Sequence, residues 1–152
     1  MIWHTILKED VIYYHATSYD NLMSIFRDGI KPGIDGIYSS DSAQLSVNWI
    51  CMTKPQTKKV MVVPYKANPK THRPGTDHSP FMLQILGEPN AKVFVTSETI
   101  LPEQIDLEGI RVVDNPCYDK DFAEKFKKSI KEGKRMSWFQ IIKTEWDFKL
   151  RP

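Results

Sequence analysis

The chain has 152 residues, of which 41% are hydrophobic and 26% charged, and both values are ordinary for a globular protein. A chain of this length buries a core without metal or disulfide staples, so we expect a single domain over residues 1–152. The net charge of +2 is too small to indicate a polyanionic partner by itself. No apolar run approaches the roughly 20 residues of a membrane span, and the N-terminus lacks the basic and apolar regions of a secretory signal. These features predict a cytoplasmic protein that makes no membrane contact.

The cysteine and histidine content gives no indication of a metal site. Cys51 and Cys117 are far apart and have no neighbouring ligands at metal-site spacing. Cys51 falls on the apolar side of a predicted helix, where a free cysteine usually acts as a small hydrophobic residue. His72 and His78 lack both a cysteine and a helical i, i+4 partner. We therefore expect reduced thiols and no bound metal.

The first third of the chain predicts a strand followed by two helices. Residues 10–16 are rich in β-branched and aromatic types, which is typical of a strand. A helix capped by Ser18 or Asp20 is expected next, with an apolar stripe and a stop at Gly29. After a short extended piece at Ile37 and Tyr38, Ser40 or Asp41 is expected to cap the second helix. Its buried face is predicted to contain Ala43, Val47, Ile50 and Cys51.

The remaining chain predicts mainly strands. Strands are expected at 60–65, 81–86, 92–96 and 109–114, and a final one at 138–148. Residues 66–80 hold three prolines and no large aliphatic residue, so they predict a long exposed loop. Residues 119–132 predict a helix with aromatic residues on one face and lysines on the other. This order is typical of an α+β fold and differs from the regular alternation of a doubly wound sheet.

Two short stretches carry a family resemblance. The first is Tyr-His-Ala-Thr at residues 14–17, which places His15 on the first strand. The second is Gly-Ile-Tyr-Ser-Ser-Asp-Ser-Ala at residues 36–43. Together they resemble the ADP-ribosyltransferase-like superfamily of the histidine–tyrosine type, and they are similar to poly-ADP-ribose polymerase catalytic cores and nucleic-acid-targeting toxins. The resemblance implies split mixed or antiparallel β-sheets with flanking helices, and NAD as the substrate.

The resemblance also assigns roles to individual residues. It implies that His15 and Thr17 hold the NAD ribose and that the Tyr38 ring stacks on nicotinamide, where a cation–π attraction adds roughly 0.5–2 kcal/mol. The structural alternative is a histidine that satisfies its hydrogen bonds within the sheet, beside a tyrosine that closes the core at a turn. The full set of expected NAD-binding residues is His15, Thr17, Asn21, Tyr38, Ser39 and Ser40.

The third element of the family motif is a glutamate near the start of a later strand, and this sequence has no glutamate at the expected position. The expected position falls on or beside Ala91 and Lys92. Glu98 is our first candidate for the catalytic carboxylate, and Glu88 is the second. Glu98 and Tyr38 together form the expected catalytic set. The alternative for each is a solvated surface carboxylate.

Three functions remain open from the sequence. The first is a mono-ADP-ribosyltransferase that uses NAD to modify a protein or nucleic acid, in the manner of a toxin or effector. The second is a catalytically inactive relative that acts as a binding or inhibitor protein. The third is an RNA 2′-phosphotransferase-like activity. The basic helix expected within residues 120–135 is either a solvated face or a nucleic-acid contact.

Overall fold

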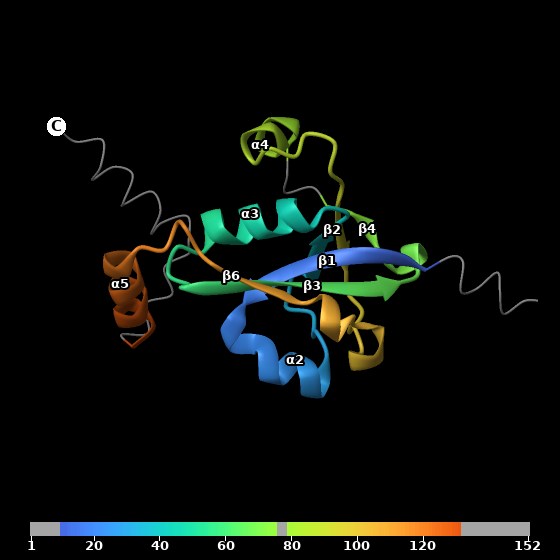
Figure 1. Ribbon diagram of the computed structural model, residues 1–152, viewed down its shortest axis with the longest axis horizontal. Coiled ribbons are helices and arrows are strands. Elements are labelled where there is room, and N and C mark those ends of the chain that lie inside the picture. Colours follow the sequence, from blue (N-terminus) through green and yellow to red (C-terminus); the bar gives the residue numbers. More distant parts are fainter. Residues whose placement is uncertain (1–9, 76–78, 132–152) are drawn as a thin grey trace, which may run out of the picture.

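The computed structural model describes residues 10–75 and 79–131 (Figure 1). The strands are β1 (Val11–Ser18), β2 (Ile37–Ser40), β3 (Lys59–Ala67), β4 (Arg73–Pro74), β5 (Val93–Thr96) and β6 (Arg111–Asp114). The helices are α2 (Leu22–Asp28), α3 (Ala43–Thr53), α4 (Pro80–Ile85) and α5 (Lys120–Lys131). Short 3-10 turns occupy η1 (Tyr19–Asn21), η2 (Pro69–Thr71), η3 (Pro102–Gln104) and η4 (Leu107–Gly109). This combination confirms the expected α+β class.

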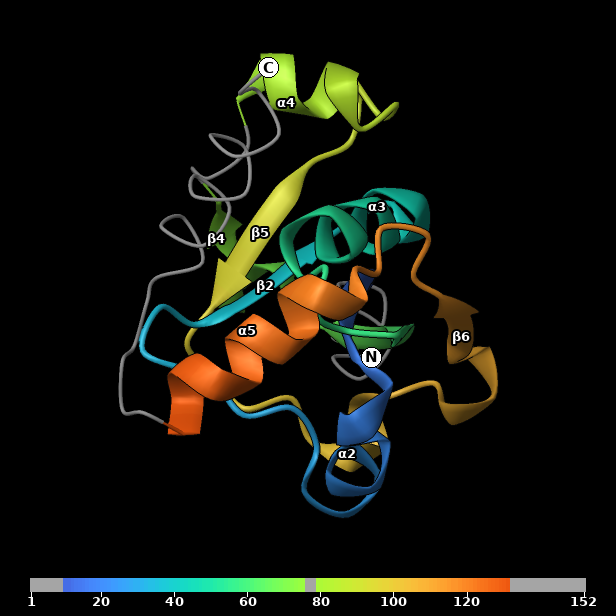
Figure 2. The same ribbon diagram turned by 90° about the vertical axis from the view of Figure 1, so that its left-hand side faces the viewer.

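The strands form a single antiparallel sheet in the order β4-β5-β2-β1-β3-β6, with β6 at one margin and β4 beside β5 at the other (Figure 2). β1 and β3 pair over eight residues, whereas β1 and β2 are joined by one pair, Tyr14 opposite Ser40. The split sheets implied by the resemblance are therefore one continuous sheet with a narrow junction at its centre.

Helices cover the two faces of the sheet, with α3 on one side and α2 on the other (Figure 1). Successive residues of β1 point to opposite faces, so this strand contributes to both layers. On the α2 side, buried residues of β1, β2 and β3 pack with Ile25, Ile30, Ile100 and Ile105. On the α3 side, Ile50 and Cys51 pack on Val60. The predicted buried face of the second helix is thus confirmed at Ile50 and Cys51.

The helix ends follow the expected signals in part. The predicted cap of α2 at Ser18 or Asp20 is wrong, because α2 follows Asn21, which makes no side-chain capping bond, and Ser18 caps η1 instead. Gly29 ends α2 with a φ of 77°, a left-handed conformation that favours glycine. The cap of α3 is Ser42 and not the predicted Ser40 or Asp41, because the Ser42 Oγ accepts a hydrogen bond from the Leu45 amide at 3.1 Å. The predicted helix over 119–132 is confirmed as α5.

The predicted strand at 81–86 is wrong, because this segment is the helix α4. Ser79 accepts a hydrogen bond from the Met82 amide at 3.2 Å, and Pro80 stands at the first helical position. Proline is preorganised for that position, since its φ is helical and its missing N–H would have no partner there. Local capping therefore outweighs the strand preference of the apolar run.

The expected exposed loop at 66–80 is also partly wrong. It contains η2 and β4, and the His72 side chain is buried with 8% exposure. The final strand expected at 138–148 lies outside the described residues, as do residues 132–135 of the basic segment.

Candidate functional site

A pocket of about 270 Å³ lies between the C-terminal part of β1 and helix α2. Three of the predicted NAD-binding residues, His15, Thr17 and Asn21, line it together. The other lining residues are Ser24, Ile25, Asp28, Gly29, Ile30 and Lys31. The strand residues come from alternate positions of β1, so His15 and Thr17 point to the same face. The structure thus brings half of the predicted set into one place.

The imidazole of His15 is fixed by a hydrogen bond across the narrow sheet junction. Its Nδ1 lies 2.6 Å from the carbonyl oxygen of Tyr38. A carbonyl only accepts hydrogen bonds, so Nδ1 carries the proton. Burial lowers the pKa of His15 below 6.5, the bond to Tyr38 opposes this, and the charge of Lys54 lowers it further. The ring is therefore neutral at pH 7, and its Nε2 is an acceptor.

Thr17 and Asn21 form a second polar pair in the same pocket. The Asn21 side-chain amide donates to the Thr17 hydroxyl oxygen at 2.8 Å. Thr17 therefore acts as an acceptor toward Asn21 and keeps its own proton available for donation. With the His15 Nε2, this gives the pocket one acceptor and one donor two residues apart on one strand. A polyhydroxylated ligand such as a sugar matches this set.

Four pocket residues lie on one face at the start and along the length of α2, and three of them, two polar and one apolar, are not among the predicted site residues. Asn21, Ser24, Ile25 and Asp28 recur at i, i+3, i+4 and i+7, the spacing of one helical face. Extending that pattern from Asn21 would have found Ser24 and Asp28. Asp28 pairs with the neighbouring Arg27 at 2.9 Å, and this hydrogen bond is the largest cause that lowers the Asp28 carboxyl pKa. Lys31, in the segment after α2, adds a cation at the pocket.

The wall of the pocket is made by the turn that follows α2. Ile30 exchanges two backbone hydrogen bonds with Ile100, at 2.8 and 2.9 Å. This bridge holds Gly29 against the Ile100 carbonyl, so closely that a side chain at Gly29 would collide with it. The pocket depends on this close approach, and Gly29 is the residue that permits it.

The remaining predicted NAD-binding residues lie outside this pocket. Tyr38 contributes its carbonyl to the His15 bond, and its ring is not part of the lining. The Ser39 and Ser40 side chains are buried with 4% and 2% exposure. The Ser39 hydroxyl is bonded to the Tyr65 hydroxyl, and the Ser40 hydroxyl to that of Ser46, at 2.7 and 2.6 Å. We therefore leave Ser39 and Ser40 out of the site that we propose below.

The two candidate carboxylates lie at opposite ends of β5, and neither lines the pocket. Glu98 is exposed beyond the C-terminal end of β5, two residues before the Ile30–Ile100 bridge. Its charge acts on His72 and raises the pKa of that residue as the smallest of three effects. Glu88 instead accepts a hydrogen bond from Ser42 at 3.2 Å, close to the start of β5. Of the two, Glu98 is closer along the chain to the pocket wall.

A chain of side-chain hydrogen bonds lies against β1 and includes a residue of β3. Ser39, Tyr65, His72 and Thr71 are linked in turn by hydrogen bonds of 2.7, 2.8 and 2.8 Å. Thr71 donates to the Asn68 carbonyl, so it accepts from His72 Nδ1, and His72 Nε2 accepts from Tyr65. Tyr13 stacks on the His72 ring with centroids 4.1 Å apart. Burial lowers the His72 pKa, which keeps the ring in the neutral form that this chain requires.

The lowered pKa values of the half-buried His15 and the buried His72 predict that the protein becomes less stable on mild acidification. The pKa values of His15 and His72 are below 6.5 in the folded protein and return to about 6.5 on unfolding. Between the folded values and pH 6.5 the unfolded chain binds more protons, so the free energy of unfolding decreases as the pH falls through this window. We expect urea denaturation at pH 7.5 and 5.5 to show this loss. The loss should be smaller in His15→Gln, and an equal loss in that variant would contradict the prediction for His15.

The described ranges contain no group of three or more histidine, cysteine, aspartate or glutamate residues placed to hold a metal ion. Among the helices of these ranges, none has both the length and the apolar character needed to cross a membrane. Neither the protein-family models nor the curated proteins include a match to this chain.

Proposed function

We propose that the protein is an NAD-dependent mono-ADP-ribosyltransferase whose ribose site is the pocket beside α2. The observation that carries the proposal is the hydrogen bond from His15 Nδ1 to the Tyr38 carbonyl. This bond turns Nε2 of a neutral imidazole into an acceptor, beside a threonine hydroxyl that can donate. A vicinal diol is complementary to that pair, because one hydroxyl donates to His15 and the other accepts from Thr17.

The size of the pocket supports a sugar in place of a whole dinucleotide. About 270 Å³ is slightly below the roughly 300–1,000 Å³ of pockets that enclose drug-sized ligands. A ribose fits inside, and the rest of the dinucleotide extends beyond the pocket. The cationic Lys31 lies at the same pocket and is suited to the pyrophosphate.

In the proposed reaction the bond between nicotinamide and C1″ of the ribose breaks. Nicotinamide leaves with the bonding electron pair and becomes neutral, and the acceptor's lone pair forms the new bond to C1″ as the acceptor loses a proton. The developing oxocarbenium charge needs a nearby carboxylate, as in glycoside hydrolysis. Glu98, which is outside the pocket lining but two residues before the wall residue Ile100, is the carboxylate that we propose for this role.

Nicotinamide release from labelled NAD, with and without cell lysate, tests this function. We expect Thr17→Val and His15→Ala to weaken NAD binding by about tenfold to a hundredfold, since each removes a hydrogen bond worth about 1–3 kcal/mol in a buried site. Gln44→Ala, on the opposite face of the sheet, is the matched control and should bind NAD as the wild type does. Thermal melting of each variant separates lost binding from lost folding. Equal NAD affinity in folded Thr17→Val and wild type would overturn the ribose site.

A second function, an NAD-binding relative without catalysis, is favoured by the start of β5. Lys92 occupies the place where the family resemblance expects a glutamate, and its amide is bonded to Asp41 at 2.8 Å. The Glu98→Gln variant distinguishes the two functions. A transferase keeps NAD binding and loses nicotinamide release in this variant, whereas a binding protein shows no release even before the substitution.

A further inference from the structure

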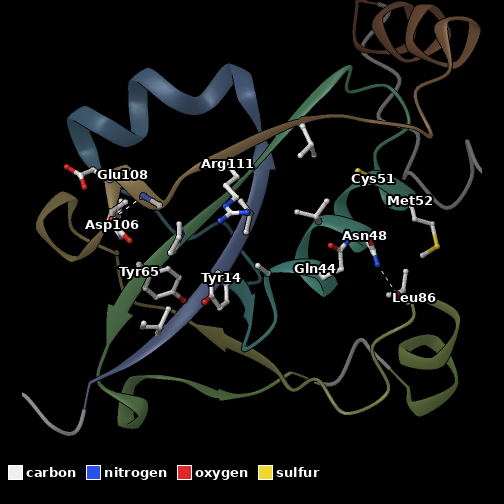
Figure 3. Close-up of a pocket in the computed structure, with 18 of the residues that line it drawn as sticks. Tyr14, Gln44, Asn48, Cys51, Met52, Tyr65, Leu86, Asp106, Glu108 and Arg111 are labelled. Carbon is white, nitrogen blue, oxygen red and sulfur yellow. Dashed lines mark hydrogen bonds between the residues drawn. The ribbon is translucent and has the colours of Figure 1, made fainter.

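A second and larger cavity lies on the other face of the sheet. It is a groove of about 1310 Å³, floored by β1, β3 and β6 and bordered by α3, α4 and the segment with η3 and η4 (Figure 3). Figure 3 shows Asn48 and Leu86 at one end, joined by a hydrogen bond of 2.8 Å, and Asp106 and Glu108 at the other. Ile12 and Tyr14 of β1 line this groove, whereas His15 and Thr17 line the ribose pocket on the opposite face.

The groove is larger than a small-molecule site and exposes apolar side chains. Its volume exceeds the roughly 300–1,000 Å³ typical of pockets for small ligands. Ile12, Ile85 and Val113 line it and are 47%, 58% and 38% exposed. These exposed side chains come from β1, α4 and β6, so apolar surface is available along the groove for a partner. A polypeptide segment with apolar side chains suits it better than a metabolite does.

The charged residues that line the groove indicate the net charge that its occupant should carry. Four carboxylates line it against two cations, so its formal net charge is −2. The carboxylates are Glu103, Asp106, Glu108 and Asp114, and the cations are Lys66 and Arg111. The occupant is therefore expected to combine apolar side chains with a net positive charge.

Residues 132–152 of the same chain have this composition. They include eight large apolar residues, among them Trp138, Phe139, Trp146 and Phe148. Five lysines and arginines against three acidic residues give this segment a net charge of +2. Residues 1–9 have one lysine and one glutamate and lack the positive charge.

The segment is also long enough to reach the groove. Cys117, three residues before α5, lines the groove, so this helix begins beside it. The 12 residues of α5 span about 18 Å. A chain that returns from Lys131 at about 3.3 Å per residue covers this distance in about six residues. The rest of residues 132–152 is then available to fill the groove.

We propose that residues 132–152 bind the groove floored by β1, β3 and β6 in the same molecule, with their apolar side chains on its floor and their cations beside its carboxylates. This intramolecular contact is independent of NAD, because the groove and the ribose pocket lie on opposite faces of β1. Failure of one proposal therefore leaves the other standing.

Zero-length carbodiimide cross-linking of the full chain, followed by peptide mass spectrometry, tests this contact. We expect cross-links from Lys134, Lys143 or Lys149 to Glu103, Asp106, Glu108 or Asp114. The matched comparison set is Asp20 of η1, Asp28 of α2 and Asp35 of the segment before β2, none of which lines the groove. Cross-links to that set at equal or higher yield would overturn the proposal. Cross-links to the groove from Lys8 or the amino terminus in place of the three lysines would do so as well.

Two further experiments test whether the contact is intramolecular and whether apolar side chains hold it. In an equal mixture of ¹⁴N- and ¹⁵N-labelled protein, we expect cross-linked peptides of a single label, and mixed-label peptides would assign the groove to a second copy. The double variant Trp138→Ala/Trp146→Ala keeps all lysines and should lower the groove cross-link yield several-fold. An unchanged yield in this variant would show that apolar contact does not hold the segment there.

Discussion

Replacing Gly29 by alanine is expected to lower the free energy of unfolding by about 3 kcal/mol. Gly29 has a φ of 77°, where an L-residue with a side chain is strained. An added Cβ would also collide with the carbonyl group of Ile100 and touch the Pro102 ring. Since Ile100 is held by its two bonds to Ile30, the backbone cannot move away without breaking the bridge.

Thermal melting and urea denaturation measure this loss, and two glycines serve as matched controls. Gly33 has no atom within 4 Å of an added Cβ, so Gly33→Ala should leave stability nearly unchanged. Gly87 has a φ of 78° but open space around it, so Gly87→Ala isolates the backbone strain at about 1–2 kcal/mol. A Gly29→Ala loss no larger than that of Gly87→Ala would mean that the contact with Ile100 is not rigid. Such a result would remove the argument that this bridge forms the pocket wall.

Much of the frame around the site follows from local signals in the sequence. The β-branched and aromatic residues at 10–16 predict β1, and the Leu22 to Gly29 pattern predicts α2 with its end. These two elements place His15, Thr17 and Asn21 within one pocket, because the strand runs directly into the helix through a short turn. Residues near each other in the chain on a strand–helix unit are the ones whose proximity the sequence can predict.

Contacts between segments that are distant in the chain could not be predicted from the sequence. The sequence pairs His15 with the ring of Tyr38, yet the structure joins His15 to the Tyr38 carbonyl. This depends on β1 and β2 meeting at only one register pair, a feature set by the whole sheet. The hydroxyls of Ser39 and Ser40 were predicted for a ligand, but they bond to Tyr65 and Ser46, which come from other elements. Strand pairing and the burial of polar side chains join segments that are distant in the chain. They therefore leave no local pattern in the sequence.

The groove illustrates the same point on the opposite face. Its lining joins residues of β1, β3 and β6 with side chains from α3 and the turns η3 and η4. Each strand contributes two to four positions to it and the rest come from other segments, so no single stretch of sequence identifies it. The incomplete cover of this face becomes visible only once α3 is seen to pack on one part of the sheet, where Ile50 and Cys51 contact Val60.

Replacing Tyr65 by phenylalanine should cost about 3 kcal/mol, although it removes a single oxygen atom. The Tyr65 hydroxyl accepts from Ser39 and donates to His72, at 2.7 and 2.8 Å. All three side chains are buried, with exposures of 1%, 4% and 8%. The substitution leaves two buried polar groups without their partner, and each such group costs about 1–3 kcal/mol. Tyr19→Phe, at a residue that is 41% exposed, is the matched control and should be nearly neutral.

A double-mutant cycle decides whether the hydrogen bonds or the packing of Tyr65 carry this cost. Ser39→Ala removes one of the two stranded groups, so Tyr65→Phe should be milder in that background than in the wild type. The coupling energy is expected at about 1 kcal/mol or more, measured by urea denaturation at pH 7.5, where His72 is neutral. Additive losses would show that Ser39 and Tyr65 do not depend on each other. The buried chain would then consist of energetically separate contacts.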